Sequence, residues 1–169
     1  MTAVIRSAQT ADNAAIQAVH RQAFETDAEA RLVSALRASG CEQISLVATR
    51  DDMIVGHILF TPVLLESRST PRLMGMAPVA VLPEWQSQGI GSQLINAGLE
   101  DCRALGIDAV VLLGHADYYP RFGFVPSIQF GIRSEYDVPA ENFMLLELKS
   151  GSLSNCEGIV RYHEAFANL

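Results

Sequence analysis

Charged residues are scarce in this sequence, and one kind is almost missing. Only 18% of the 169 residues are charged, and Lys149 is the single lysine among 12 cationic residues. The formal net charge of −7 argues against a nucleic-acid-binding surface, which needs clustered lysine and arginine. A site for an anionic ligand therefore has to draw on local backbone dipoles, because the overall field of the chain repels anions.

Cysteines and long apolar runs are also scarce. Cys41, Cys102 and Cys156 are far apart and odd in number, which argues against a disulfide framework or a metal cluster and favours reduced thiols in a cytoplasm. The longest apolar stretches, such as residues 109–113, are too short to cross a bilayer. Residues 1–7 lack the apolar run of a signal peptide. We therefore expect a cytoplasmic protein that binds neither a membrane nor a metal.

The apolar content is high enough for a real core. Hydrophobic residues make up 49% of the chain, and its length is typical of one domain, so we expect a single domain over residues 1–169. Helices are predicted from a cap at Thr10 to about 23, from a capping box at 26–29 to Gly40, and over 89–105. Strands are predicted at 4–6, 44–50, 53–66, 73–82, 107–113, near 124 and at 143–149, with a helical turn near Tyr118 and a less regular C-terminal segment.

The middle of the chain has the order of a parallel unit. Residues 107–113 are continuously apolar, as in a parallel strand that is buried on both faces. Together with the strand at 73–82 and the helix at 89–105, they form a right-handed βαβ unit. The remaining strands are joined by short connections, and Asp51-Asp52 is a hairpin signal. The predicted fold class is therefore α/β with a mixed sheet.

The most informative stretch leads from the strand at 73–82 into this helix. Residues 86–91 read Gln-Ser-Gln-Gly-Ile-Gly, so two glycines open the helix. The first N–H groups of a helix lack partners, and its dipole favours negative charge, so phosphates bind there readily. Gly89 and Gly91 have no Cβ and let an anion approach the backbone. A tight strand-to-helix turn without a ligand is the alternative interpretation.

Two other phosphate cradles do not fit. A P-loop needs Gly-Lys-Ser/Thr after its second glycine, but Gly91 is followed by Ser92 and Gln93. A dinucleotide fingerprint needs a third small residue, but Leu94 stands at that position, and the downstream acidic residue is missing.

The pattern Gln-x-x-Gly-x-Gly after an apolar strand resembles the acyl-CoA site of the GNAT superfamily of N-acetyltransferases. Residues 118–124, Tyr-Tyr-Pro-Arg-Phe-Gly-Phe, are similar to a second segment of that superfamily. The residues at 27–30 (Asp-Ala-Glu-Ala), 76–78 (Met-Ala-Pro) and 162–164 (Tyr-His-Glu) resemble those of the YhbS-like subgroup. This resemblance implies a central splayed, mostly antiparallel sheet with one parallel βαβ unit, and acetyl-CoA as the co-substrate.

The resemblance also implies which residues contact the cofactor. The backbone of Val79 and Val81, on either side of Ala80, is expected to pair with the pantetheine arm. The diphosphate is expected at the amides of residues 87–92, with Gln86 and Gln88 shaping the loop. These expected cofactor-binding residues are Val79, Ala80, Val81, Gln86, Ser87, Gln88, Gly89, Ile90, Gly91 and Ser92.

Tyr119 matches the tyrosine that protonates the departing CoA thiolate in this superfamily. A phenol with a pKa near 10 stays protonated at neutral pH, and a thiolate near 8.5 accepts its proton. Packing in an aromatic turn is the alternative for Tyr119. The chain departs from the commoner pattern, because Leu112 and His115 stand where many relatives have asparagine and alanine.

The general base is open at this stage. Amines are mostly protonated at neutral pH, so a group has to remove a proton, yet residues 74–81 contain no carboxylate. We favour His115, with His57 and Glu84 as alternatives that ordinary packing or solvation would also explain. Residues Glu25, Asp27 and Glu29 form either an acidic mouth for cationic amines or a helix start that favours acidic side chains.

The predicted function is direct transfer of an acetyl group from acetyl-CoA to a small-molecule or protein amine. Tyr119 and His115 are the expected catalytic residues, and no metal or nucleic acid is expected. The alternative is a noncatalytic acyl-CoA sensor or interaction module, and transfer to a hydroxyl or to a tRNA-borne amine is a third hypothesis. The pattern is compatible with a monomer or a homodimer.

Overall fold

The computed structural model describes residues 3–67 and 70–168. It contains two compact units: unit 1 comprises Met1–Thr61, Ala77–Asp101 and Glu164–Leu169, and unit 2 comprises Pro62–Met76 and Cys102–His163. Two strands and one helix have residues in both units. The single domain expected from the sequence therefore stays a prediction.

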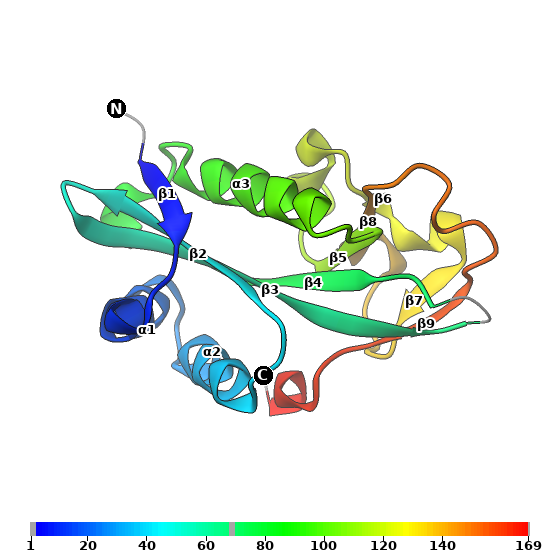
Figure 1. Cartoon of the computed structure of the whole chain (residues 1–169), viewed down its shortest axis with the longest axis horizontal. Coiled ribbons are helices and arrows are strands. Elements are labelled where there is room, and N and C mark those ends of the chain that lie inside the picture. Colours follow the sequence, from blue (N-terminus) through cyan, green and yellow to red (C-terminus); the bar gives the residue numbers. More distant parts are fainter. Residues whose placement is uncertain (1–2, 68–69, 169) are drawn as a thin grey trace. The chain divides into compact units, whose positions relative to one another are not determined.

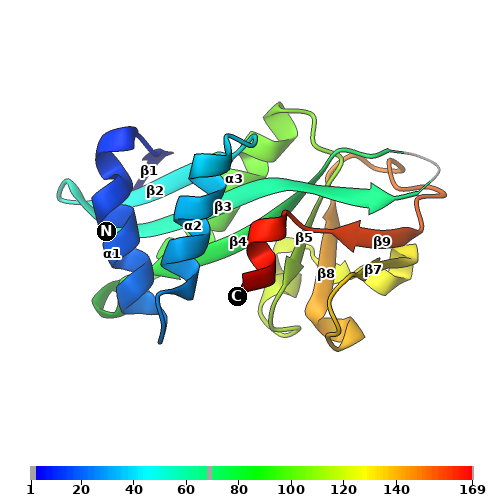
Figure 2. The same ribbon diagram turned by 90° about the horizontal axis from the view of Figure 1, so that it is seen from below.

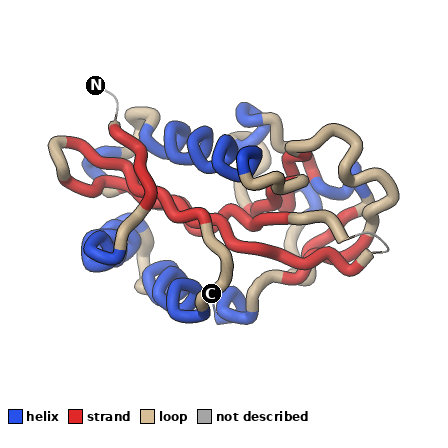
Figure 3. Tube along the Cα trace, viewed as in Figure 1, coloured by secondary structure: helices blue, strands red, loops and turns tan. Residues whose placement is uncertain are grey.

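Among the described residues, unit 1 contains three α-helices in layers around a group of strands. Figures 1 and 3 show α1 and α2 on one face of these strands and α3 on the other. Its elements, three of which continue into unit 2, are β1 (Val4–Ser7), η1 (Thr10–Asp12), α1 (Asn13–Ala23), α2 (Ala28–Ser39), β2 (Ile44–Arg50), β3 (Met53–Glu66), β4 (Leu73–Val81), η2 (Pro83–Trp85), α3 (Ile90–Ala104) and η6 (Glu164–Asn168). Figure 2 shows η6 next to α2.

The predicted hairpin of unit 1 is confirmed. Strands β2 and β3 pair antiparallel up to Arg50 and Met53, and β1 pairs antiparallel with β2. Between them, Asp51 and Asp52 have φ values of 50° and 63°. Positive φ at both central residues is the type I′ geometry that matches the twist of two antiparallel strands.

Helix α3 packs closely on β3 because two glycines leave room for it. A Cβ at Gly56 would lie 3.1 Å from Leu94 Cδ1, and one at Gly98 would lie 2.1 Å from the ring of Phe60. The missing side chains let the helix approach the strand, which positions the turn before Ile90 at the end of β4. The predicted helix over 89–105 is therefore confirmed to within one residue at each end.

The two predicted helix starts are wrong in detail. A 3₁₀ turn precedes α1, whose N-cap is Asp12 and not Thr10. Asp12 accepts hydrogen bonds from Arg6 and from the backbone of Gln9, and these contacts fix the entry of the chain. At α2 the N-cap is Asp27, so the box predicted at residues 26–29 is not formed.

Unit 2 is built on a second group of strands. Besides the ends of β3 and β4 it contains β5 (Ala109–Leu113), η3 (Tyr119–Phe122), β6 (Val125–Pro126), η4 (Ser127–Phe130), β7 (Ile132–Ser134), η5 (Ala140–Asn142), β8 (Phe143–Glu147) and β9 (Gly158–Arg161). Strand β8 pairs antiparallel with β5 and β6, and Figure 2 shows β9 along β7. The core includes Val63, Leu73, Val111, Phe143, Leu145 and Val160.

The strand order confirms the predicted mixed sheet. Within the described residues, nine strands form one sheet in the order β1-β2-β3-β4-β5-β8-β6, and β9 pairs with β3 and β7. Strands β4 and β5 are parallel over residues 73–75 and 109–111, as the βαβ prediction requires. The short strands β7 and β9, which also pair in parallel, were not predicted.

Candidate active site

The turn over residues 86–92 of unit 1 is open to solvent. Ser87, Gln88 and Gly89 are exposed, and Ile90 begins α3 as a buried residue. Ser87 and Gly89 have φ values of 62° and 86°, in the left-handed region. Gln88, between them, does not have a positive φ, so left-handed and ordinary residues alternate here. Such an alternation turns successive N–H groups toward the same side and forms a concave anion site.

The backbone N–H groups at the start of α3 are unpaired and can donate hydrogen bonds to an anion. The first intrahelical partner is reached at Gln93, whose N–H donates to the Gly89 carbonyl over 3.0 Å. In the described part of the chain, no hydrogen bond involves the N–H groups of Gly89, Ile90 or Gly91. A Cβ at Gly91 would meet only Val81 Cγ2, 4.0 Å away, so the space beside this glycine is empty. Neither the backbone of Gly91 nor a neighbouring protein atom requires a glycine there.

Two glutamine side chains tie this turn to the residues that precede it. The Gln86 amide nitrogen Nε2 donates to the Val81 carbonyl over 2.9 Å, and Gln88 Nε2 donates to the Glu84 carbonyl over 3.4 Å. The guanidinium of Arg50 lies 4.7 Å from the ring centre of Trp85, which brings a positive charge next to the turn. Sequence reasoning missed Arg50, because nothing in the order of residues links it to Trp85.

Near the end of β4, the backbone groups of the half-buried residues Val79 and Val81 have a defined orientation. Leu82 donates its N–H to the Val55 carbonyl on β3 over 2.8 Å. Since consecutive residues of a strand present their backbone groups to opposite edges, those of Val79 and Val81 face away from β3. In the described residues, no strand of unit 1 covers that edge. Ala80, between them, is buried.

In unit 2, Tyr119 lies in a closely packed aromatic turn. Its ring makes edge contacts with Tyr118 at 5.0 Å and with Phe124 at 6.1 Å between centroids. A Cβ at Gly114 would lie 2.4 Å from Tyr119 Cε2, so the ring rests on the backbone just after β5. Burial, with a smaller contribution from Tyr118, raises the pKa of Tyr119 above its ordinary value of 10.0. The Tyr119 hydroxyl has no hydrogen-bond partner among the described residues and is therefore available to a ligand.

The histidines predicted as bases lie in different environments. His115 is exposed, two residues after the end of β5 in unit 2. His57 is buried in unit 1, with Nδ1 2.8 Å from His20 Nε2 and Nε2 2.8 Å from the Ser45 hydroxyl. With both ring nitrogens occupied, His57 fits its structural interpretation. Glu84 is exposed in η2, as expected for a solvated side chain.

The three acidic residues near the start of α2 do not act alike. Asp27 forms an exposed ion pair with Arg31 over 2.9 Å, which fits a helix-start role. Glu29 instead has one carboxylate oxygen, Oε1, that is buried without a hydrogen-bond partner among the described residues. Glu25 is exposed, so of these three carboxylates Glu29 is the one with a buried oxygen that has unused acceptor capacity. Sequence analysis could not tell these residues apart, because the burial of single atoms leaves no signal in the order of residues.

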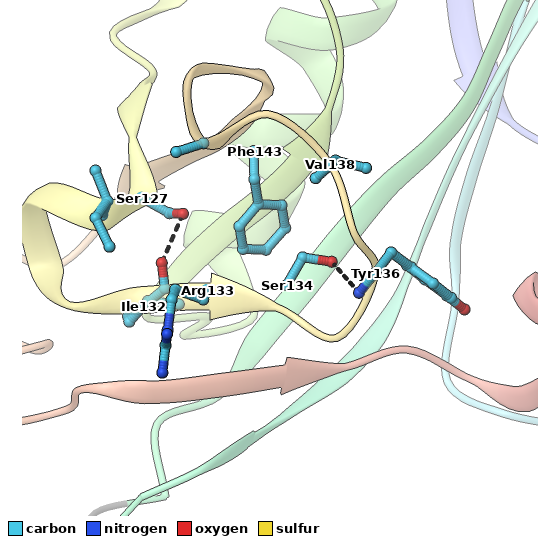
Figure 4. Close-up of a pocket in the computed structure, with 9 residues that line it drawn as sticks. Ser127, Ile132, Arg133, Ser134, Tyr136, Val138 and Phe143 are labelled. Carbon is cyan, nitrogen blue, oxygen red and sulfur yellow. Dashed lines mark hydrogen bonds between the residues drawn. The ribbon is translucent and has the colours of Figure 1, made fainter.

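Unit 2 also contains a cavity of about 190 Å³ that was not predicted. Figure 4 shows the ring of Phe143 in this cavity. The Ser127 hydroxyl donates to the Ile132 carbonyl over 2.8 Å, and Ser134 Oγ accepts from the Tyr136 N–H over 3.0 Å. The Ser127 proton is therefore engaged, whereas the Ser134 hydroxyl proton stays available, and the lining combines these polar groups and Arg133 with Ile132, Val138 and Phe143.

No metal-binding cluster of histidine, cysteine or acidic side chains occurs within residues 3–67 and 70–168. Over the same residues, no helix is both long and apolar enough to cross a membrane. Within the described residues, Cys41, Cys102 and Cys156 form no disulfide.

The sequence matches one protein family and several known proteins. Residues 42–126 match the acetyltransferase (GNAT) domain. The chain is 36% identical to the uncharacterized N-acetyltransferase YhbS of Escherichia coli over 92% of this chain and 93% of that protein. It is 40% identical to the uncharacterized N-acetyltransferase YjhQ of Escherichia coli over 78% of this chain and 75% of that protein.

Solved structures resemble the whole chain. The crystal structure of YhbS in complex with CoA has a TM-score of 0.94, covering 99% of this chain and 93% of that one. A GNAT family acetyltransferase from Brucella melitensis, in complex with acetyl-CoA, has a TM-score of 0.80 at 35% identity and 97% coverage of both chains.

Proposed function

Because the chain belongs to the GNAT acetyltransferase family, we propose that it transfers an acetyl group from acetyl-CoA to an amine by direct attack. The observation that carries this proposal is the exposed turn at residues 87–91, with its unpaired amides and the empty space beside Gly91. The CoA and acetyl-CoA bound to two relatives support a CoA thioester as co-substrate.

The proposed grip on the co-substrate is made by the main chain. The amides of residues 87–92 would donate hydrogen bonds to the diphosphate, with the dipole of α3 adding to the attraction. The uncovered edge of β4 would pair with the amide groups of the pantetheine arm at Val79 and Val81. Arg50 adds one positive charge close to this turn, in a chain whose net charge is −7.

The proposed chemistry needs one acid and one base. The amine attacks the thioester carbonyl, backbone N–H groups near Val79 stabilise the oxyanion, and the C–S bond breaks. The Tyr119 hydroxyl gives its proton to the leaving thiolate, for which a raised pKa keeps it protonated. His115 is the proposed base because it is exposed next to the end of β5, whereas His57 has no free nitrogen.

Two experiments with the wild-type protein test the proposal. Acetyl-CoA at a hundred times its dissociation constant is expected to raise the free energy of unfolding by roughly 2.7 kcal/mol. Pantetheine, which lacks the diphosphate, is the matched control and is expected to stabilise far less. No thermal shift with millimolar acetyl-CoA would contradict both the enzyme and the sensor hypothesis.

Thiol release from acetyl-CoA, measured with a panel of amines and matched alcohols, separates the remaining hypotheses. We expect release with at least one amine and none with its alcohol. Stabilisation by acetyl-CoA without release for any acceptor would favour the noncatalytic sensor. A cytoplasmic location and a monomeric or homodimeric state stay predictions.

A further inference from the structure

Unit 1 contains a second cavity of about 190 Å³, remote in sequence from the turn at residues 87–92. Its walls come from the segment that follows β1, from α1 and α2, and from β2 and β3. No residue of this cavity belongs to the proposed acetyl-transfer machinery. A ligand bound here would therefore be separate from acetyl-CoA.

A buried chain of hydrogen bonds ends at this cavity. His57, which lines it, is bonded through Nδ1 to His20 and through Nε2 to the Ser45 hydroxyl, each over 2.8 Å. His20 Nδ1 is buried and has no partner among the described residues. Buried N–H groups without acceptors are rarer than buried acceptors without donors, so Nδ1 of His20 is best assigned as unprotonated.

This assignment fixes the direction of the whole chain. His20 then carries its proton on Nε2 and donates it to His57, which in turn donates from Nε2 to Ser45. Because the Ser45 oxygen accepts that bond, its own O–H proton is free to donate into the cavity. Burial lowers the pKa of both histidines, so both stay neutral and the direction is kept at neutral pH.

The opposite wall supplies a positive charge. Arg37 lines the cavity from an exposed position on α2, and no partner of its guanidinium is found in the described residues. Asn13, the first residue of α1, also lines the cavity, so the positive end of that helix faces it. No lining residue is acidic, and the neighbouring Asp12 is held by Arg6 over 2.7 and 3.1 Å.

We propose that this cavity binds a small monocarboxylate, with Arg37 and the Ser45 hydroxyl as donors to its two oxygens. The remaining walls include the buried side chains of Ile16, Val33 and Leu59, which suit a short aliphatic tail. A single guanidinium matches one carboxylate, whereas a doubly charged phosphate would lack a second cation. The volume accommodates a ligand of roughly the size of butyrate.

Thermal unfolding of the full chain without any CoA tests this site. We expect 10 mM sodium butyrate to raise the melting temperature relative to equal concentrations of sodium chloride and of butyramide. The shift should fall at least fivefold in Arg37→Gln and in Ser45→Ala. Arg31→Gln, an exposed change on the same helix but outside the cavity, should keep it.

Each other outcome overturns the proposal. Equal shifts with butyrate and chloride would show that no carboxylate binds, and an undiminished shift in Arg37→Gln would place the ligand elsewhere. A shift with inorganic phosphate that equals the shift with butyrate would indicate a general anion site. Because Arg37 is exposed, its variant is expected to fold, and circular dichroism checks this.

Discussion

The turn at residues 87–92 in unit 1 and the turn at 118–124 in unit 2 are built in opposite ways. The first is exposed, contains two left-handed residues and offers backbone amides. The second is closed by ring contacts between Tyr118, Tyr119, Phe122 and Phe124, and offers one phenol. A site made of main chain depends on backbone shape, whereas a site made of a side chain depends on that one residue and its supports.

This difference predicts that binding and turnover can be separated by mutation. Changes to the first turn should act on CoA affinity, and changes to the second should act on the chemical step.

Tyr119→Phe should have the largest effect. Loss of the phenolic proton removes the proposed acid, so kcat should fall roughly 100-fold or more while the dissociation constant of CoA changes less than twofold. Steady-state thiol release and calorimetric titration of CoA measure the two quantities. Tyr118→Phe, in the same turn, is the control and should behave as the wild type. Normal turnover in Tyr119→Phe would refute the assignment of the acid.

Gly114→Ala tests whether the position of the phenol matters. The new Cβ would lie 2.4 Å from Tyr119 Cε2, so the ring has to move. We expect kcat to fall about 10- to 100-fold and stability to fall by about 1–3 kcal/mol, with CoA affinity retained. Urea unfolding and the kinetic assay measure these effects. Unchanged kcat would mean that the support by Gly114 is dispensable.

Gly91→Ala tests the first turn. Nothing in the protein opposes a methyl group there, and alanine favours the helix by up to about 1 kcal/mol, so stability should rise slightly. The methyl would occupy the space proposed for the diphosphate, so CoA affinity should fall about tenfold. Asn96→Ala, on an exposed position of α3, is the matched control that leaves affinity unchanged. Equal CoA affinity in Gly91→Ala would contradict the proposed cradle.

The smallest effect concerns the pH dependence of folding. Burial lowers the pKa of His20 from 6.5 to about 4 and lowers that of His57 as well. Below pH 6.5 the unfolded chain binds protons that the folded chain does not, so stability should fall as the pH falls from 6.5 toward 4. The slope is at most about 1.4 kcal/mol per pH unit for each histidine. Urea unfolding at pH 7, 6 and 5 measures it, and His57→Gln should reduce the slope; an unchanged slope in that variant would contradict the assignment.

Much of the turn at 87–92 could be predicted because its causes are local. An apolar strand, a short loop and two glycines before an amphipathic helix are adjacent in sequence, and α3 begins one residue from its predicted start. Asp51 and Asp52 predicted the hairpin for the same reason. The start of α1 was missed in detail, because the contacts of Asp12 with Arg6, and not Thr10, determine where this helix begins.

The sequence by itself determined the family, the mixed sheet and the order of its main elements, since local patterns of apolar residues and turns specify them. Only the tertiary structure decided that Arg50 covers Trp85, that Gly114 supports Tyr119 and that His57 joins His20 to Ser45. The short strands β7 and β9 were also decided by the tertiary structure, because three or four residues form a strand only when a distant partner is present. Contacts between residues far apart in the chain depend on packing, and periodicity along one segment contains no record of them.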